Sequence, residues 1–376
     1  MVAILVLGGL SPLGRHVVED LVNKHPEAKI VVSDRSLPQF AFFRPVHEAV
    51  FSKVQYVQAN IARREAVLRL FDLYDYDWVI NCSEVLTLNQ VDEMYDERIY
   101  QTAVTIAKIC QEKATPVLVQ LSTAEGLFPT NEVPSTEEAE FKPFSTCSKH
   151  FREMEDELKS MSNLNLVIAR RGFVYGNDDY SALTSALVCC DLLKMEGSTI
   201  AFPVDGRNMM STVHIIDVAR AMTHLAQWYC ESNKKGQVLI YNISDNTCRS
   251  PAEILDMFAE VIPGSDIRWI PEDPTLPKAD AEALSNSLNE MSLEYWLDTL
   301  NHYNVTSTPL SPEIDPVYLS YARFLFNGRK IVQETGFKYI YDDGPTVQCL
   351  IDMVQGFKEL GVWPPCNPHS MSSKEE

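Results

Sequence analysis

Two small groups of residues have types and spacings that could support chemistry. The first is a turn in which Gly8, Gly9 and Gly14 separate an apolar, β-branched run from a helix-like segment. Backbone without side chains can approach a phosphate closely, and N–H groups at a helix N-terminus attract its charge. Ser11 replaces the middle glycine of this pattern and lies near Leu13. The stretch therefore predicts a pyrophosphate-binding turn, and the alternative is a strand, turn and helix without a ligand.

The second group consists of hydroxyls and one amine in the middle of the chain. Ser122 and Thr123 end an apolar run, and Ser145 and Lys149 lie four residues apart on a helix-like segment. Side chains at this spacing occupy one helix face, one turn apart. Thr123, Ser145 and Lys149 thus offer two hydroxyls and an amine, and the family resemblance given below implies catalytic positions for them.

Alternating strands and helices must position both groups. Apolar, β-branched runs that are typical of buried strands alternate with helix-like segments, and the runs lie at residues 2–7, 29–33, 54–57, 78–82, 117–121 and 166–169. This alternation predicts an α/β fold, a doubly wound parallel sheet of the Rossmann type, with ligands at the carboxyl ends of the strands.

The strand ends supply further candidate cofactor residues. Asp34 follows the second strand, about 20 residues after the glycine turn, where a carboxylate accepts hydrogen bonds from an adenosine ribose and repels a 2′-phosphate. This position favours NAD over NADP, although the adjacent Arg35 weakens the preference, and a merely solvated aspartate is the alternative. Other residues at strand ends are predicted to line the cofactor, and they are Asn60, Ile61, Cys82 and Ser83.

The amino-acid composition of the chain argues against some classes of binding partner and favours one type of compartment. The chain has 376 residues and a formal net charge of −20, which argues against binding to nucleic acids or acidic membranes because both are polyanions. Its nine cysteines form no CxxC pair, which favours free thiols, a reducing compartment and no zinc site. No apolar run has membrane-spanning length, and Met1 leads directly into the first strand. A cytoplasmic protein is the expectation.

Four stretches in a fixed order resemble one protein superfamily. After the glycine turn come LSTAEGLF, the SxxxK pattern at 145–149, and RRGFVYG followed by STVHIIDVARA. Together they resemble the extended short-chain dehydrogenases/reductases, which include nucleotide-sugar epimerases, dehydratases and 3β-hydroxysteroid dehydrogenases. The resemblance covers about residues 1–225. It implies a dinucleotide-binding domain at 1–175 and a smaller α+β subdomain at 176–366, with some later segments returning to the sheet.

The same resemblance assigns roles and exposes a departure. In that superfamily a tyrosine stands four residues before the lysine, which lowers the pKa of the phenol and holds the nicotinamide ribose, while a serine or threonine holds the substrate oxygen. Lys149 matches the lysine, and Thr123 or Ser122 matches the hydroxyl, but Ser145 occupies the tyrosine position. A serine hydroxyl is a far weaker acid than a phenol of pKa about 10, so ordinary acid/base chemistry is impaired.

Three other positions depart from the superfamily pattern. Ile99 stands where an asparagine is usual, Thr102 where a glycine is usual, and Met210 where an arginine holds the substrate diphosphate of nucleotide-sugar enzymes. Arg207 is an alternative diphosphate ligand. The residues expected to bind the cofactor therefore match the superfamily pattern better than the residues expected to act in catalysis.

The C-terminal half contains one unusual segment. Residues 271–315, within an insertion at about 265–320, are acidic and rich in proline, yet their apolar residues have helical spacing. They predict an amphipathic helix that packs on its own domain or binds a protein partner. His214 is expected to be a packed residue at the start of a helix, with Asp217 capping nearby. The tail from residue 367 is expected to be disordered.

A weaker resemblance bears on where in the cell the protein is located. The stretches PVDGRNMMSTVHIID and NGRKIVQETGF faintly resemble the dehydrogenase-like N-terminal region of a long adenylate kinase associated with cilia. A ciliary or flagellar location is therefore the alternative to the cytoplasm.

Two functions follow from these observations. The first is an NAD(H)-binding protein that has lost the acid/base tyrosine and acts as a scaffold or subunit. The second is an active NAD-dependent oxidoreductase, epimerase or dehydratase on a nucleotide sugar or hydroxysteroid-like substrate, in which a remote tyrosine or water supplies the proton.

Overall fold

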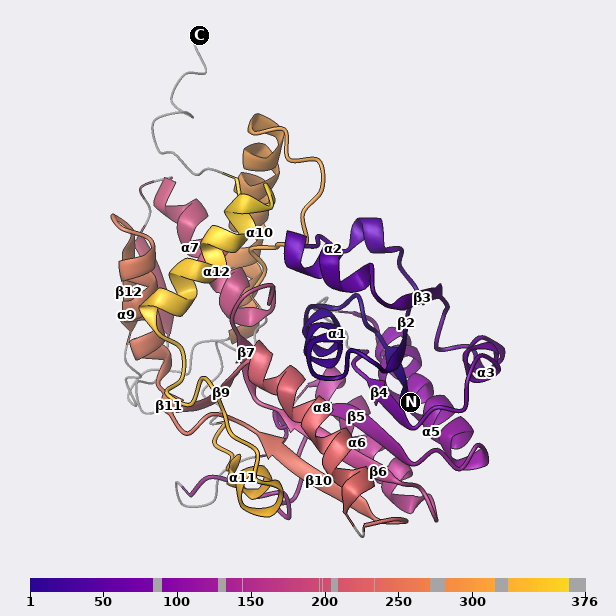
Figure 1. Cartoon of the computed structure of the whole chain (residues 1–376). Coiled ribbons are helices and arrows are strands. Elements are labelled where there is room, and N and C mark those ends of the chain that lie inside the picture. Colours follow the sequence, from indigo (N-terminus) through magenta and orange to yellow (C-terminus); the bar gives the residue numbers. More distant parts are fainter. Residues whose placement is uncertain are drawn as a thin grey trace. The chain divides into compact units, whose positions relative to one another are not determined.

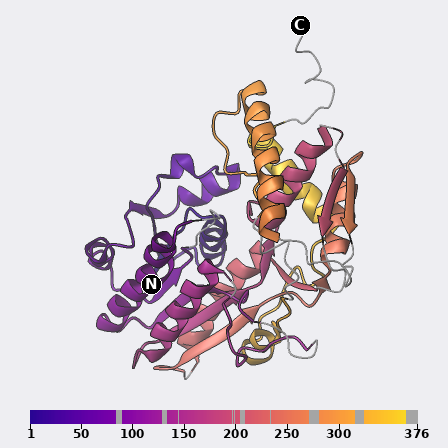
Figure 2. The same cartoon turned by 180° about the vertical axis from the view of Figure 1, so that it is seen from behind.

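The fold comes from a computed structural model of the chain, shown from two sides in Figures 1 and 2. The structure describes residues 1–364 except 84–89, 128–132, 144, 196, 198, 204–208, 233, 271–280 and 315–323. The chain forms two compact units that each combine separate stretches. The first unit contains Met1–Phe173, Ser211–Thr247 and Phe324–Asp342, and the second contains Val174–Met210, Cys248–Arg323 and Asp343–Glu376.

A seven-stranded parallel sheet forms the centre of the first unit. The strand order is β10-β6-β5-β4-β1-β2-β3, and every pairing is parallel. The strands are β1 (Ala3–Leu7), β2 (Lys29–Asp34), β3 (Gln55–Gln58), β4 (Trp78–Asn81), β5 (Val117–Thr123), β6 (Leu166–Arg171) and β10 (Val238–Ile243). All of β1, β4 and β5 is buried, as expected for strands that are covered on both faces. The predicted doubly wound α/β fold is confirmed.

Helices cover both faces of this sheet (Figures 1 and 2). On one face α8 packs against α1 and against β4, β5 and β6, while α5 and α6 pack against each other and against β5 on the opposite face. The α-helices of the unit are α1 (Pro12–Lys24), α2 (Pro45–Phe51), α3 (Arg64–Phe71), α4 (Asp92–Tyr95), α5 (Thr102–Glu112), α6 (Thr146–Ser160), α8 (Ile215–Glu231) and α11 (Arg329–Thr335). A 3₁₀ turn, η1 (Pro38–Phe40), precedes α2, and a π-helical segment, η2 (Asp96–Gln101), joins α4 to α5.

A buried ion pair ties α6 to the sheet. The Arg170 guanidinium donates from Nε and Nη2 to the Glu155 carboxylate at 2.8 and 2.6 Å, and the Ser122 hydroxyl donates to the same carboxylate at 2.8 Å. Glu155 is fully buried and Arg170 is 2% exposed. Because two charges without partners would be very unfavourable at this depth, the pair specifies how α6 sits on β5 and β6.

The second unit is smaller and contains both helices and strands. Its strands β8 (Thr199–Pro203) and β12 (Asp266–Ile270) pair in parallel, and its helices are α7 (Ala182–Met195), α9 (Pro251–Val261), α10 (Ala281–His302) and α12 (Val347–Glu359). α10 packs on α7, and α12 packs on α9. Short strands lie where the chain passes between units, and they are β7 (Phe173–Tyr175), β9 (Met210–His214) and β11 (Cys248–Arg249).

The start of α8 corrects one expectation. His214 is buried at the N-cap position, where its Nδ1 accepts a hydrogen bond from the Ile216 N–H at 3.2 Å. Asp217 does not cap this helix. Its carboxylate instead accepts hydrogen bonds from the N–H groups of Ile340 and Tyr341 at 2.9 and 2.7 Å, which fastens the returning segment 324–342 to α8.

The predicted helix within the insertion is present as α10. Trp296 is buried, while the adjacent Leu297 is 60% exposed. The tail from residue 367 and residues 271–280 lie outside the described residues. No helix in the described part of the chain is both long and apolar enough to cross a membrane.

Candidate functional site

The glycine turn lies where β1 and β4, neighbours in the sheet, send their connections in opposite directions. The N–H groups of Gly8 and Gly9 donate to the Ser33 carbonyl at 2.9 and 3.3 Å, so the turn is held against the end of β2. Gly8 has a φ of +71°, and a Cβ there would lie 2.6 Å from the Ser83 backbone. A Cβ on Gly14 would lie 2.2 Å from the Gly8 carbonyl oxygen. Both positions therefore require glycine.

Ser11 explains how the turn works without its middle glycine. It is the N-cap of α1, and its hydroxyl accepts a hydrogen bond from the Gly14 N–H at 3.0 Å and donates to the Cys82 carbonyl at 3.4 Å. The serine therefore satisfies one of the N–H groups at the helix start and connects the turn to the end of β4. Pro12 begins the helix and contributes no N–H.

A pocket opens at this edge of the sheet, within the first unit. Seven of its lining residues were predicted from the sequence, and they are Gly8, Ser11, Asp34, Arg35, Asn60, Ile61 and Ser83. Four more lining residues were not predicted as cofactor ligands, and they are Ala62, Glu97, Arg98 and Thr102. The predicted residues Gly9, Leu13, Gly14, Cys82 and Lys149 are not among the lining residues. Of these, Leu13 is buried in the first turn of α1, and Cys82 is buried directly after β4.

Asp34 supplies one of the carboxylates that line this pocket. Its Oδ2 accepts a hydrogen bond from the Leu10 N–H at 3.1 Å, and its Oδ1 accepts one from the Ser36 N–H at 3.2 Å. A carboxylate has about four acceptor positions, so two remain for hydroxyl groups of a ligand. Asp34 thus both holds the glycine turn and presents acceptors to the pocket.

Residues that follow β3 and β4 also line the pocket. The Asn60 side-chain oxygen accepts from the Ala62 N–H at 3.1 Å, which turns the chain immediately after β3. The Ser83 hydroxyl donates to the Asn81 side-chain oxygen at 2.6 Å, and Asn81 donates to Gln120 at 2.9 Å. These hydrogen bonds fix the ends of both loops.

Two arginines add positive charge to the pocket. Arg35 follows Asp34, and Arg98 comes from the π-helical segment η2. Burial lowers the pKa of the Arg98 guanidinium, and the nearby charge of Arg35 lowers it further. Two cationic residues and two carboxylate residues, Asp34 and Glu97, therefore line this pocket. The guanidinium groups suit phosphate oxygens of a ligand, and the carboxylates suit its hydroxyl groups.

The three catalytic candidates lie elsewhere and have structural contacts. None of Thr123, Ser145 and Lys149 lines the pocket. The Thr123 hydroxyl accepts from the Glu125 N–H at 3.1 Å, at the end of β5. The Lys149 ammonium lies 3.7 Å from the Asp92 carboxylate and 4.0 Å from that of Glu153.

Ser145 is the N-cap of α6. Its hydroxyl accepts a hydrogen bond from the Ser148 N–H at 3.1 Å, and its own N–H donates to the Ser148 hydroxyl at 2.9 Å. This reciprocal arrangement is a capping box. The structure therefore places Ser145 at the start of a helix, in a capping role.

The structure also gives the positions of Ile99, Thr102 and Met210, the other residues that the sequence analysis singled out. Ile99 is buried within η2, and the Thr102 hydroxyl donates to the Glu97 carbonyl at 2.7 Å while Thr102 lines the pocket. Met210 begins β9. Arg207, the alternative diphosphate ligand, lies outside the described residues.

A parallel sheet with a glycine turn at its switch point, and a carboxylate at the end of the next strand, defines a dinucleotide-binding Rossmann fold. Residues 4–244 match the model of the NAD dependent epimerase/dehydratase family, and the chain belongs to that family. The predicted kinship with the extended short-chain dehydrogenases/reductases is confirmed. No curated protein matches the chain by sequence.

Solved structures share the fold at low sequence identity. dTDP-glucose 4,6-dehydratase from Bacillus anthracis, in complex with NAD, is 16% identical with a TM-score of 0.68, and the match covers 96% of this chain and 98% of that one. UDP-glucose 4-epimerase from Thermus thermophilus, also in complex with NAD, is 18% identical with a TM-score of 0.64, and the match covers 94% of this chain and 99% of that one.

Proposed function

We propose that the protein binds NAD(H) in the pocket at the glycine turn and acts through this binding, as a cofactor-loaded scaffold or subunit without the acid/base chemistry of its family. The observation that carries this proposal is the role of Ser145, which caps α6 through its hydroxyl where the superfamily pattern requires a phenol. Removing a proton carrier costs roughly a hundredfold to ten-thousandfold in rate.

Cofactor binding is supported by independent features of the pocket. Gly8 and Gly14 keep the backbone close to the ligand position, and Asp34 presents acceptors for ribose hydroxyls. The Asp34 carboxylate also repels a 2′-phosphate, although Arg35 and Arg98 oppose this repulsion. We therefore propose NAD as the preferred dinucleotide, with a smaller margin over NADP than the aspartate alone would give.

The contacts of Lys149 support the proposal that the protein binds its cofactor without turnover. In the superfamily pattern this lysine lowers the pKa of the tyrosine, but Ser145 removes that partner. The ammonium is instead near two carboxylates, those of Asp92 and Glu153. The side chain is half-exposed, so these contacts position it on the α4–α6 surface and contribute little to stability.

A second candidate function rests on two residues, Thr123 and Lys149, that match the superfamily pattern. Thr123 and Lys149 occupy the positions that hold the substrate oxygen and the nicotinamide ribose in active superfamily members. If another residue or water supplies the proton, the protein is an NAD-dependent epimerase, dehydratase or oxidoreductase, and the second unit would supply the substrate pocket.

Titration of the full-length protein with NADH and NADPH, followed by turnover assays with UDP-glucose, dTDP-glucose and hydroxysteroids, separates the two functions. The scaffold proposal expects saturable NADH binding, tighter than NADPH binding, and no change in cofactor oxidation state or sugar configuration. Turnover that is abolished by Thr123→Ala or Lys149→Ala would overturn it in favour of the enzyme. Failure to bind either dinucleotide would overturn both.

A scaffold also needs a protein partner. We propose the insertion that contains α10 as its binding surface, because the exposed Leu297 lies on this helix in an acidic segment. The compartment we propose is the cytoplasm, with the cilium or flagellum as the alternative. Capture with the protein lacking residues 265–320 as control would test the surface, and equal capture by both would contradict it.

A further inference from the structure

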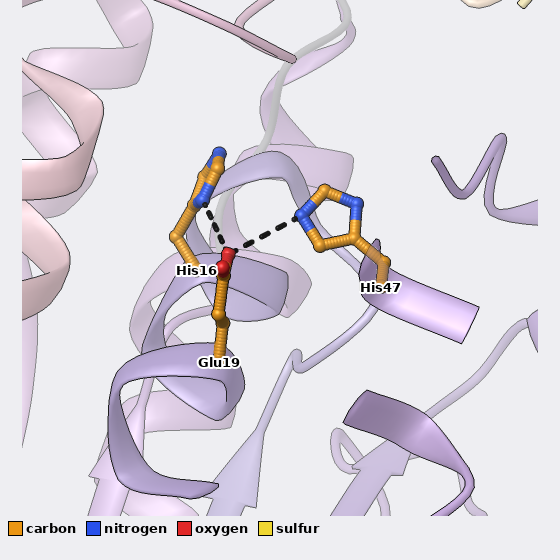
Figure 3. Close-up of side chains that lie close together, drawn as sticks. All are labelled: His16, Glu19 and His47. Carbon is orange, nitrogen blue, oxygen red and sulfur yellow. Dashed lines mark ion pairs between the residues drawn. The ribbon is translucent and has the colours of Figure 1, made fainter. Parts of the chain in front are cut away.

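Three side chains with metal-binding atoms meet in the first unit, away from the residues that line the pocket. His16 and Glu19 lie three residues apart on α1, and His47 reaches them from α2 (Figure 3). Residues at this spacing share one face of a helix, so the imidazole and the carboxylate project in the same direction. α1 and α2 pack directly against each other.

The distances within this group are close to those of a metal centre. His16 Nδ1 and His47 Nε2 lie 3.5 and 3.7 Å from the same Glu19 oxygen, Oε2, and the three ligand atoms are all within 4.8 Å of one another. In a tetrahedral zinc site with metal–ligand bonds of about 2.0–2.1 Å, neighbouring ligand atoms are about 3.4 Å apart. The two imidazole–carboxylate distances exceed this value by only a few tenths of an ångström.

The surroundings also suit a metal ion. His47 is fully buried and His16 is 4% exposed, whereas the Glu19 side chain is 27% exposed. The imidazoles are thus held in fixed positions by packing, while the carboxylate side remains open for metal entry and for a water ligand. Hydrogen bonding to His16 lowers the pKa of Glu19, and the charges of His16, His47 and Arg44 act in the same direction against burial, so the carboxylate is ionised at neutral pH.

We propose that His16, Glu19 and His47 form a binding site for a divalent transition metal of the zinc type, with water completing the coordination. Two imidazoles and one carboxylate are a ligand set that favours zinc and its first-row neighbours over magnesium or calcium, which prefer oxygen ligands. The bound ion crosslinks α1 to α2 and thereby steadies the helix that carries the glycine turn. The cysteine pattern gave no indication of this site.

Calorimetric titration of the EDTA-treated full chain with ZnCl₂ and with MgCl₂ tests the proposal. We expect one zinc ion per chain, no comparable magnesium binding, and a loss of affinity of about tenfold or more in Glu19→Gln and His47→Gln. His302→Gln is the matched control because His302 is an exposed histidine on α10.

Two features keep the test decisive. Glu19→Gln changes a partly exposed side chain, so a folding defect in the buried His47→Gln variant, visible by circular dichroism, leaves one clean variant. Because the chain has nine cysteines, the cobalt-substituted protein is examined for a thiolate-to-metal charge-transfer band. The proposal is overturned by a wild-type chain that binds no zinc, by zinc affinity that Glu19→Gln leaves unchanged, or by a thiolate band.

Discussion

Replacement of His214 by asparagine should remove one source of acid sensitivity. His214 is 4% exposed, accepts a hydrogen bond from the Ile216 N–H, and stacks on Tyr341 with ring centroids 3.7 Å apart. Burial lowers its pKa to about 3, with a smaller contribution from the charge of His16. Protonation would also place two N–H groups against each other at the helix cap.

The size of the effect follows from proton binding. An unfolded histidine has a pKa of about 6.5, so below that pH the unfolded chain binds a proton at position 214 that the folded chain does not bind. Folding stability therefore falls as the pH falls from about 6.5 toward 3. This residue alone contributes a slope of about 1.4 kcal/mol per pH unit once the pH is well below 6.5, and nothing above it.

Urea denaturation between pH 5 and pH 7.5 measures the slope. His214→Asn keeps a capping acceptor but does not titrate, so its free energy of unfolding should depend less on pH than that of the wild type, by about 1.4 kcal/mol per unit below pH 6. Histidines that do not interact with His214 act equally in both proteins and cancel in the difference. Equal slopes for the two proteins would show that His214 titrates normally in the folded chain and refute the reasoning.

Three further substitutions test other parts of the fold. Gly14→Ala places a Cβ 2.2 Å from the Gly8 carbonyl oxygen, so NADH titration should show no saturable binding, and binding like that of the wild type would refute the close approach. Glu155→Gln leaves the buried Arg170 without its counter-charge and should lower the free energy of unfolding by about 3–5 kcal/mol in urea, whereas a loss below about 1 kcal/mol would mean that water reaches the pair. Ser145→Ala should cost about 1 kcal/mol from the lost cap and leave NADH affinity unchanged, and a large fall in affinity would place Ser145 at the cofactor.

The strands and the glycine turn were predictable because they depend on local sequence. Buried parallel strands are continuous apolar runs, and β1, β4 and β5 show them without interruption. The need for glycine at positions 8 and 14 also follows from backbone geometry alone. Most predicted pocket residues therefore lie at strand ends, where the topology of a parallel sheet brings them together.

The missed pocket residues have a physical explanation. Glu97 and Arg98 lie in the π-helical segment η2, which adds one residue to a helical turn and rotates the side chains that follow. The regular period of 3.6 residues that predicts helices from a sequence cannot indicate which of these side chains face the pocket. The group formed by His16, Glu19 and His47 was missed for another reason, since about 30 residues separate His47 from its partners and no local pattern records their contact.

The charges around Lys149 bear on our proposal that the protein binds its cofactor without turnover. A lysine that must lower the pKa of a phenol needs its positive charge undiminished and directed at the reacting group. Here Asp92 and Glu153 lie within 4.0 Å of the ammonium, and Asp92 also accepts a hydrogen bond from His150 at 3.1 Å. These carboxylates offset the positive charge that an acid/base site would use. The serine at position 145 and the charges around Lys149 are therefore both in accord with our proposal that the protein binds its cofactor without turnover.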